Sequence, residues 1–245
     1  MVELPMRSSG AMDRQSILSI NQIKVQGVRD KKNILEINRP DNREKNPAPS
    51  QPQINTPQMA MPKLNNTIRK GQKAPLENAG KLTGIEACLG WNVKNPACDV
   101  DVSAFLLSGN KVISDDWFVF YGQPDSPDNS TSISSDGKTD RQVVTIDFTK
   151  INEKVEKIVF VLNINETLEN GLNFNMVQDA YIRILKPDTK SEIVSFLMDE
   201  YYENATSMMI GEIYKHNGSW KFNAIGSGVA RDLAGLCELY GVQID

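Results

Sequence analysis

Aromatic residues are confined to one part of this chain. No Phe, Tyr or Trp precedes Trp91, and all of the 8 Phe, 6 Tyr and 3 Trp residues lie from that position onward. Aromatic side chains supply much of the buried area of a protein core. We therefore expect a tail followed by one domain of about 180 residues, rather than two small domains.

The N-terminal region has the composition of a tail. Residues 40–62 contain six of the 12 prolines, among Asn, Gln and Ser, and such a segment buries too little apolar surface to offset its ordering entropy. We predict a disordered or loosely structured tail over residues 1–66, with a Pro-rich linker at 40–62, and a domain over 67–245. Two apolar stretches, 17–25 and 34–37, suit either an extended docking peptide or a transiently collapsed tail.

The net charge of −4 is unevenly distributed. Residues 1–66 hold 10 Lys and Arg against 6 Asp and Glu, whereas residues 67–245 hold 17 against 25. An acidic domain disfavours binding to phosphate backbones, which requires clustered cations. It is compatible with a metal cation or a basic partner. We therefore expect no nucleic-acid partner.

The cysteine and histidine content excludes an ordinary zinc site. The three cysteines, Cys88, Cys98 and Cys237, have no framework spacing, and His216 is the single histidine. Free thiols are typical of a reducing compartment. The sequence also shows neither a transmembrane segment of about 18 apolar residues nor the apolar core of a signal peptide. These features favour a cytoplasmic location.

Alternating and aromatic runs predict an all-β fold. Val100, Val102 and Ala104 alternate with polar residues, and residues 158–162 are apolar on both faces, as in a central strand. Asn217-Gly218 between two apolar runs is a strong hairpin signal. Further strands are predicted at 117–121, 144–148, 181–185, 208–214 and 220–222. Many short strands separated by turns indicate a two-sheet antiparallel β-sandwich.

One helix is predicted near the C-terminus. Residues 229–242 carry an apolar stripe at helical spacing, and Gly241 stands where a helix ends. We expect this C-terminal helix to pack on a sheet. A second, short helical turn is expected within residues 165–179.

Catalytic motifs do not stand out in the sequence. His216 lies beside the predicted turn, with no nucleophile or orienting acid placed by spacing. There is no Gly-rich phosphate loop, nucleophile elbow or dinucleotide fingerprint. We expect a protein that is not an enzyme.

Aspartates are concentrated in the first half of the domain. Between Asp99 and Asp147 there are nine aspartates and three basic residues. Two aspartates at i and i+2 on a strand point to one face, and crowded carboxylates repel unless a cation neutralises them. Ca²⁺ prefers such oxygen ligands. The alternative is that these are solvated turn aspartates.

An ordered set of motifs resembles one known family. Lys70-Gly71-Gln72, the segment 89–92 (LGWN) and the segment 99–107 (DVDVSAFLL) are similar to the KGQ, LGWD and DLDASAFLL motifs of TerD-type tellurite-resistance and stress-response proteins. Further likenesses follow in family order: FVFY at 118–121, SPD at 126–128, KIVFV at 157–161, AYIR at 180–183 and GEIYKHNGSWKF at 211–222. The resemblance runs from about residue 68 to 242.

The resemblance implies a β-sandwich that binds Ca²⁺ through acidic loops and acts in bacterial stress responses, without an established enzymatic activity. It assigns metal ligation to Asp99, Asp101, Asp115 and Glu166. With the neighbouring loop acids, the predicted metal ligands are Asp99, Asp101, Asp115, Asp116, Asp136, Asp140 and Glu166.

One loop departs from the family pattern. The family carries a longer acidic loop where this chain has residues 134–142, in which Asp136 and Asp140 are the only acids and Gln142 replaces a usual Glu. Fewer anionic ligands weaken calcium sites, so we expect fewer or weaker Ca²⁺ ions. The LGWD motif likewise has Asp where this chain has Asn92.

Two functions from different classes follow. The first is a calcium-binding stress-response module whose ordered loops present a surface to protein partners. The second is a metal-independent interaction scaffold whose N-terminal tail recruits a partner protein.

Overall fold

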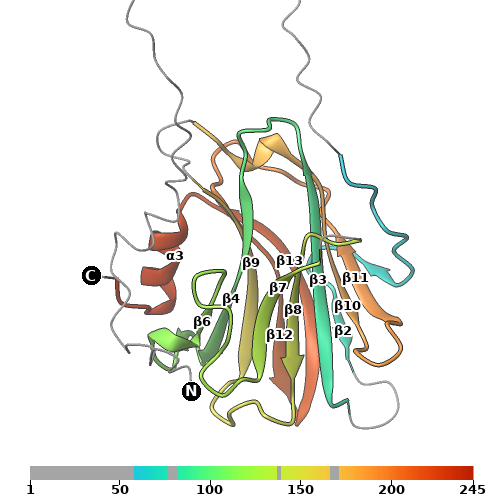
Figure 1. Ribbon diagram of the computed structural model, residues 1–245, viewed down its shortest axis with the longest axis vertical. Coiled ribbons are helices and arrows are strands. Elements are labelled where there is room, and N and C mark those ends of the chain that lie inside the picture. Colours follow the sequence, from blue (N-terminus) through green and yellow to red (C-terminus); the bar gives the residue numbers. More distant parts are fainter. Residues whose placement is uncertain (1–57, 77–81, 137–138, 166–170, 245) are drawn as a thin grey trace, which may run out of the picture.

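The computed structural model of the chain describes residues 58–76, 82–136, 139–165 and 171–244. They form two packed β-sheets with one α-helix near the C-terminus (Figure 1). The predicted all-β sandwich with a C-terminal helix is therefore confirmed. The predicted tail segments at 17–25 and 34–37 lie outside the described residues, and the boundary between tail and domain stays a prediction.

The first sheet, sheet A, has six strands, and every described pairing in it is antiparallel except that of β1 with β11. Their order across the sheet is β1 (Thr67–Ile68), β11 (Glu192–Leu197), β10 (Val177–Leu185), β3 (Gly84–Val93), β8 (Gln142–Asp147) and β7 (Thr131–Ser135).

The second sheet, sheet B, is antiparallel and has seven strands. Their order is β2 (Lys73–Pro75), β13 (Ser219–Val229), β12 (Ser207–His216), β9 (Lys157–Ile164), β4 (Val100–Ser108) and β5 (Lys111–Val112), with β6 (Phe118–Val119) also paired to β4.

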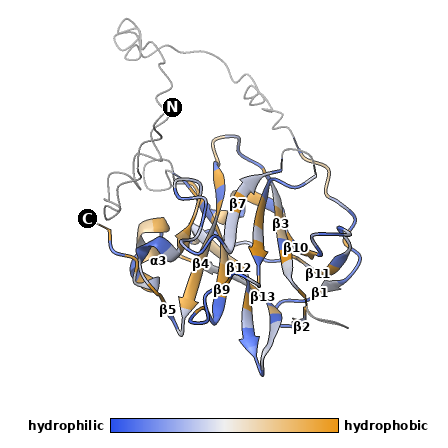
Figure 2. Cartoon of the chain, turned by 60° about the horizontal axis from the view of Figure 1, so that its bottom comes forward, coloured by the Kyte–Doolittle hydropathy of each residue, from blue (hydrophilic) through white to orange (hydrophobic). Residues whose placement is uncertain are grey.

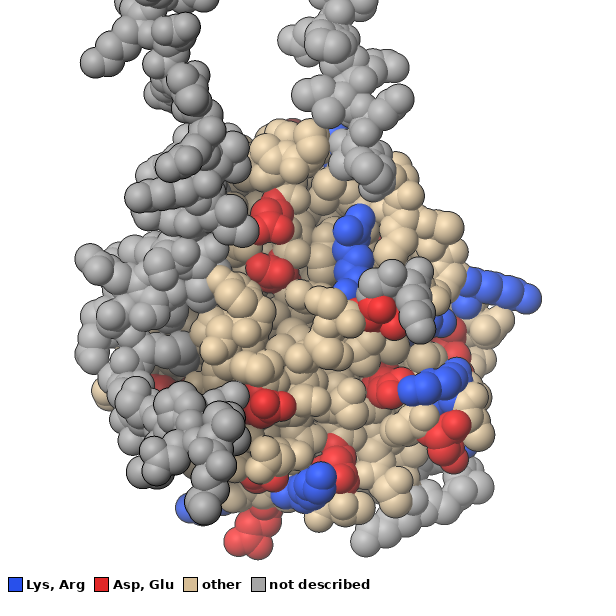
Figure 3. Space-filling view, in the orientation of Figure 1, with Lys and Arg blue, Asp and Glu red and all other residues tan. Residues whose placement is uncertain are grey.

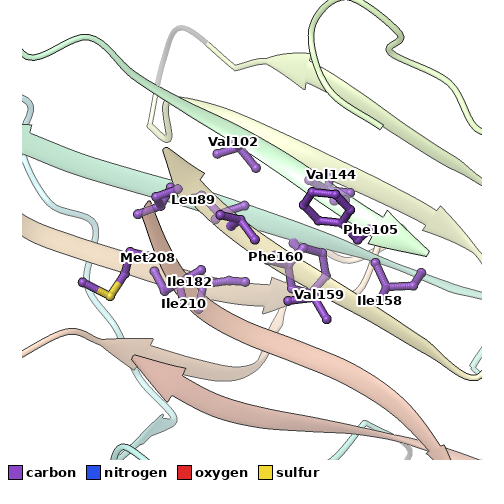
Figure 4. Close-up of a cluster of buried hydrophobic side chains, with 14 of the residues drawn as sticks. Leu89, Val102, Phe105, Val144, Ile158, Val159, Phe160, Ile182, Met208 and Ile210 are labelled. Atoms are coloured by element: carbon purple, nitrogen blue, oxygen red, sulfur yellow. The ribbon is translucent and has the colours of Figure 1, made fainter. Parts of the chain in front are cut away.

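The core lies between the two sheets. Alternate residues of facing strands point into it, among them Leu89 and Ile182 from sheet A and Val102 and Phe160 from sheet B (Figure 4). Hydrophobic residues mark the strands, whereas the connecting loops are mostly hydrophilic (Figure 2). The strand β9 lies between β12 and β4 and is almost completely buried, which confirms the predicted central strand.

The helix α3 (Leu233–Tyr240) covers the outer face of sheet B. The Tyr240 ring lies 4.6 Å from that of Phe105 on β4, and its hydroxyl contacts Met209 Sδ on β12 at 3.1 Å. The helix begins later than predicted because Val229 ends strand β13 and the Asp232 side chain caps the helix by accepting from Gly235 N. Its predicted end at Gly241, with φ of 80°, is confirmed.

Two shorter predictions are also confirmed. Asn217 and Gly218 have φ values of 51° and 79°, as a tight hairpin turn between β12 and β13 requires. The short turn expected within 165–179 is the 3-10 helix η2 (Phe174–Met176). The predicted strand at 117–121 is only partly correct, because Asp115–Trp117 form the 3-10 helix η1 and β6 holds two residues.

Candidate metal site at one rim of the sandwich

Two strands of sheet B bring four polar side chains to one end of the sandwich. Asp99 and Asp101 stand at the start of β4, and Asn163 and Asn165 stand at the end of β9. The strands pair antiparallel with Asp101 opposite Asn163, and Asn165 N donates to Asp99 O at 2.9 Å. Residues two apart on a strand share a face, so the four side chains gather on one side of this rim.

The two carboxylates converge on a single nitrogen atom. Asn165 Nδ2 donates to Asp99 Oδ2 at 3.1 Å and to Asp101 Oδ2 at 2.8 Å. The side chains expected to repel each other are thus held together by a neutral amide that donates one hydrogen bond to each. The predicted i, i+2 pairing of Asp99 and Asp101 therefore produces a shared point of contact.

A buried polar chain orients the Asn165 amide. Asn163 Nδ2 donates to Asn165 Oδ1 at 3.3 Å, and Ser103 Oγ donates to Asn163 Oδ1 at 3.5 Å. All three of these residues are buried. Buried amides with satisfied partners are held in one orientation, so the Asn165 nitrogen is directed at the carboxylates.

Gln142 connects this site to sheet A. Its Oε1 accepts from Val102 N at 2.6 Å, and its Nε2 donates to Asp101 Oδ1 at 3.3 Å. Gln142 is the first residue of β8, so the contact joins the two sheets at the rim. We refer to Asp99, Asp101, Gln142 and Asn165 as the rim site.

The rim site is electronegative. Burial raises the pKa of Asp101 and the charge of Asp99 raises it further, whereas the hydrogen bonds from Asn165 and Gln142 lower it. Burial and the same two carboxylates raise the pKa of the neighbouring Tyr121 to about 12. The ion pairs within the described part of the chain involve other carboxylates.

Asp140 is engaged in a different network. Arg183 Nε and Nη2 donate to its two carboxylate oxygens at 3.0 and 2.6 Å, and Tyr181 Oη donates to Oδ1 at 2.8 Å. The Asp140 side chain is only 3% exposed. The Tyr181 ring lies across Gly90, where a Cβ atom would stand 2.4 Å from the ring. Asp140 therefore fastens the 134–142 loop to strand β10 of sheet A.

The remaining predicted ligands are placed elsewhere or differently engaged. Asp136 Oδ2 accepts from the backbone N–H groups of Thr139 and Asp140. Asp115 and Asp116 lie in η1, beyond the β4–β5 turn and so at the opposite end of β4, where Asp115 Oδ1 accepts from Gln243 N at 2.7 Å. Glu166 lies outside the described residues. Among the described residues, no three His, Cys, Asp or Glu side chains form a metal-binding group.

Asn163 and Asn165 were not predicted as site residues. Amide side chains are uncharged, and the ligands predicted from the sequence were all carboxylates. Two asparagines at i and i+2 directly after the apolar run 158–162 were the available signal, since such residues share one face. For Asp140, the signal was Arg183 within an apolar strand, since a buried arginine needs an acidic partner.

The three cysteines are free thiols, and all three are buried. Burial is the main cause that raises the pKa of Cys88 and Cys237 to about 12 and that of Cys98 to about 11. His216 is exposed at the end of β12 beside the hairpin turn. None of these groups contributes to the rim site.

Comparison with known proteins identifies the family. The family model described as the TerD domain matches residues 64–240. The chain belongs to the TerD family. Tellurium resistance protein TerD of Serratia marcescens is 33% identical over 190 residues, which cover 74% of this chain and 99% of that protein. General stress protein 16U of Bacillus subtilis (strain 168) is 32% identical, with 73% of this chain and 98% of that protein covered.

Solved structures of related proteins are more distant in sequence. A homologue of telluride resistance protein (TerD) from Streptomyces coelicolor A3(2) is 14% identical, with a TM-score of 0.49 over 67% of this chain and 100% of that chain. Within the described part of this TerD-family chain, no helix is long and apolar enough to cross a membrane.

Proposed function

We propose that this TerD-family chain is a calcium-responsive binding module of the stress-response type, without catalytic activity of its own. The observation that carries the proposal is the convergence of Asp99 and Asp101 on one point at the rim. The names of its relatives, which include tellurium resistance and general stress proteins, support the stress-response class.

The chemistry of the rim site fits a hard divalent cation. Asp99 and Asp101 supply carboxylate oxygens, which Ca²⁺ prefers. The amides of Gln142 and Asn165 turn their nitrogens toward these carboxylates, so their oxygens would reach an ion only if the amides rotated. A cation at this point would replace the Asn165 N–H₂ group as the partner of both carboxylates. It would also offset the repulsion between Asp99 and Asp101 that contributes to the raised pKa of Asp101.

Ion binding would act on the sandwich as a whole. The rim site draws residues from β4 and β8 and from the residue after β9, so one ion would link both sheets. Two carboxylates are few for a calcium site, and ligand charge sets affinity, so we expect a Kd of about 10⁻⁴–10⁻³ M. The ordered rim would then present a surface to a protein partner.

Calorimetric titration of chelator-treated protein with CaCl₂ tests this proposal. We expect saturable heat for the wild type and none for the double variant Asp99→Asn/Asp101→Asn. Asp116→Asn is the matched control because Asp116 lies at the far end of β4, and this variant should bind as the wild type does. Wild-type protein that releases no heat at millimolar Ca²⁺ would contradict the proposal.

A second candidate is the metal-independent scaffold. The observation that favours it is the Asp140 network, in which Arg183 and Tyr181 engage the carboxylate oxygens that an ion would need. The N-terminal tail would then recruit the partner protein. Partner capture that is unchanged by chelator and by Asp99→Asn/Asp101→Asn, but lost on deletion of residues 1–57, would support this alternative over the first.

A further inference from the structure

A second polar site at the same end of the sandwich binds backbone groups of the N-terminal region. Asn92 is 6% exposed, near the end of β3, and its carboxamide contacts both polar backbone groups of Met59. Its Oδ1 accepts from Met59 N at 2.8 Å, and its Nδ2 donates to Met59 O at 3.1 Å. A buried side chain thus pairs with one residue of the N-terminal region as a neighbouring strand would.

Asp179 completes the site from the adjacent strand. Asn92 Nδ2 also donates to Asp179 Oδ2 at 3.1 Å, so both amide hydrogens have acceptors. Asp179 has a φ of 53° and stands where the pairing of β10 with β3 changes register. Few non-glycine residues adopt this left-handed conformation, and here it accompanies the contact of the carboxylate with Asn92.

Neighbouring contacts extend the site by one residue. Gln58 Nε2 donates to Val93 O at 3.0 Å, and Gln178 Nε2 donates to Gln58 Oε1 at 3.1 Å. We call Asn92, Val93, Gln178 and Asp179 the Asn92 clamp. It contacts residues 58 and 59, which precede the match to the TerD domain at 64–240.

We propose that the Asn92 clamp is a specific binding site for the chain's own N-terminal extension, which it fixes to sheet A at the end of the sandwich where β3 passes into β4. The first described residues, blue in Figure 1, start at the end of the sandwich where β3 passes into β4. Asp99 and Asp101 stand at that same end, but they share a face of β4 with Phe105, so the clamp and the rim site lie on opposite faces of the sandwich. A partner bound by the extension is thereby held at this end of the domain.

The amide of Asn92 determines the specificity of the clamp. An aspartate at this position has the same shape, but it cannot donate to Met59 O and would face the carboxylate of Asp179. Asn92→Asp should therefore release residues 58–63 while the sandwich stays folded. The clamp shares no residue with the rim site, so its test and the calcium titration can fail independently.

Hydrogen exchange of the full chain tests the clamp. We expect the Met59 amide to exchange about tenfold faster in Asn92→Asp than in the wild type, with trypsin cleaving faster after the exposed Lys63. Asn95→Asp is the matched control, because Asn95 Oδ1 accepts from Ala97 N in its own loop, as an aspartate oxygen can, and Asn95 Nδ2 makes one long contact with Met176 Sδ at 3.8 Å.

A variant in the extension itself separates the clamp from the stability of the sandwich. Met59→Pro removes the backbone N–H that donates to Asn92 Oδ1, and it changes no residue of the sandwich. We expect the same faster cleavage after Lys63, with the melting temperature of the domain changed by less than in Asn92→Asp. Cleavage at the wild-type rate in both Asn92→Asp and Met59→Pro would overturn the proposal, as would equal loosening by Asn95→Asp.

Discussion

At the residue scale, the rim site shows how a neutral amide accommodates two neighbouring carboxylates. Asn165 donates to both Asp99 and Asp101, and the bond to Asp101 favours the ionised form of that carboxylate. The compensation is incomplete for Asp101, since burial and the charge of Asp99 still raise its pKa. This residual repulsion would favour the binding of a cation.

Replacing Asp101 by Asn should remove that repulsion. A carboxylate with a raised pKa in the folded state binds more protons there than in the unfolded chain. Its contribution to the free energy of unfolding therefore falls as pH rises from about 4. We expect chelator-treated Asp101→Asn to melt at the wild-type temperature or up to about 3 °C above it at pH 7, a shift that corresponds to about 1 kcal/mol.

Thermal unfolding between pH 4 and pH 7 measures this effect. The difference in melting temperature between Asp101→Asn and the wild type should grow with pH and disappear toward pH 4. A variant that is less stable than the wild type at every pH would show that the carboxylate of Asp101 stabilises the rim even without metal.

A second residue-scale prediction concerns Asp140. Asp140→Ala would leave Arg183, whose side chain is 16% exposed, without its bidentate partner. We expect a loss of about 3 kcal/mol in the free energy of unfolding, measured with urea. Glu200→Ala, which breaks a pair with Lys70 at a side chain 56% exposed, is the control and should cost less than about 1 kcal/mol. Similar losses in both variants would argue against a structural role for the Asp140 network.

At the element scale, strands β3 and β10 depend on a glycine at their contact. A Cβ at position 90 would stand 2.4 Å from the Tyr181 ring, which would have to move away from Asp140. We expect Gly90→Ala to lower the free energy of unfolding by about 1–3 kcal/mol through overpacking. Amide exchange in the 134–142 loop should also increase, since Tyr181 no longer holds Asp140. Unchanged amide exchange in this loop would show that Gly90 does not influence its order.

Elements with a regular pattern could be predicted from the sequence. The alternation at the start of β4 and the Asn217-Gly218 turn each depend on local physics, namely side-chain direction and backbone φ. Strand β3 was not predicted because it has no alternation of buried and exposed residues: nine of its ten residues are buried. Its polar members, such as Asn92, are satisfied by partners far away in the sequence.

The candidate site could be predicted only in part. Asp99 and Asp101 lie two residues apart, so a strand brings them together in any fold of this class. Their partners Gln142 and Asn165 come from other strands, and only the register of β4 with β9 and the approach of β8 decide that contact. Asp140 shares its loop with Gln142, yet it faces Arg183 instead of the rim site.

At the scale of the whole molecule, one face carries scattered rather than concentrated charge. On the face seen in Figure 3, basic side chains lie among acidic ones around a broad uncharged area. The rim site and the Asn92 clamp both lie at the end of the sandwich where β3 passes into β4. We infer that partner binding involves this end.

The N-terminal region should contribute to stability only through its last residues. Asn65 N and Asn66 N donate to Glu192 Oε1 at 3.0 and 2.7 Å, and residues 58 and 59 occupy the Asn92 clamp. We expect deletion of residues 1–57 to leave the melting temperature within about 1 °C of that of the full chain. Deletion of residues 1–66 should lower it by several degrees, since about 1–3 kcal/mol of hydrogen bonding is lost. Equal melting temperatures for the two deletions would show that residues 58–66 add no stability.

Calcium-dependent thermal unfolding tests the central claim most directly. A ligand that binds only the folded state raises its stability by an amount set by its concentration relative to Kd. At 10 mM CaCl₂ we expect the chelator-treated wild type to melt about 3 °C or more above its metal-free temperature, and Asp99→Asn/Asp101→Asn not to respond. An equal shift in both proteins, or no shift in the wild type, would contradict calcium binding at the rim site.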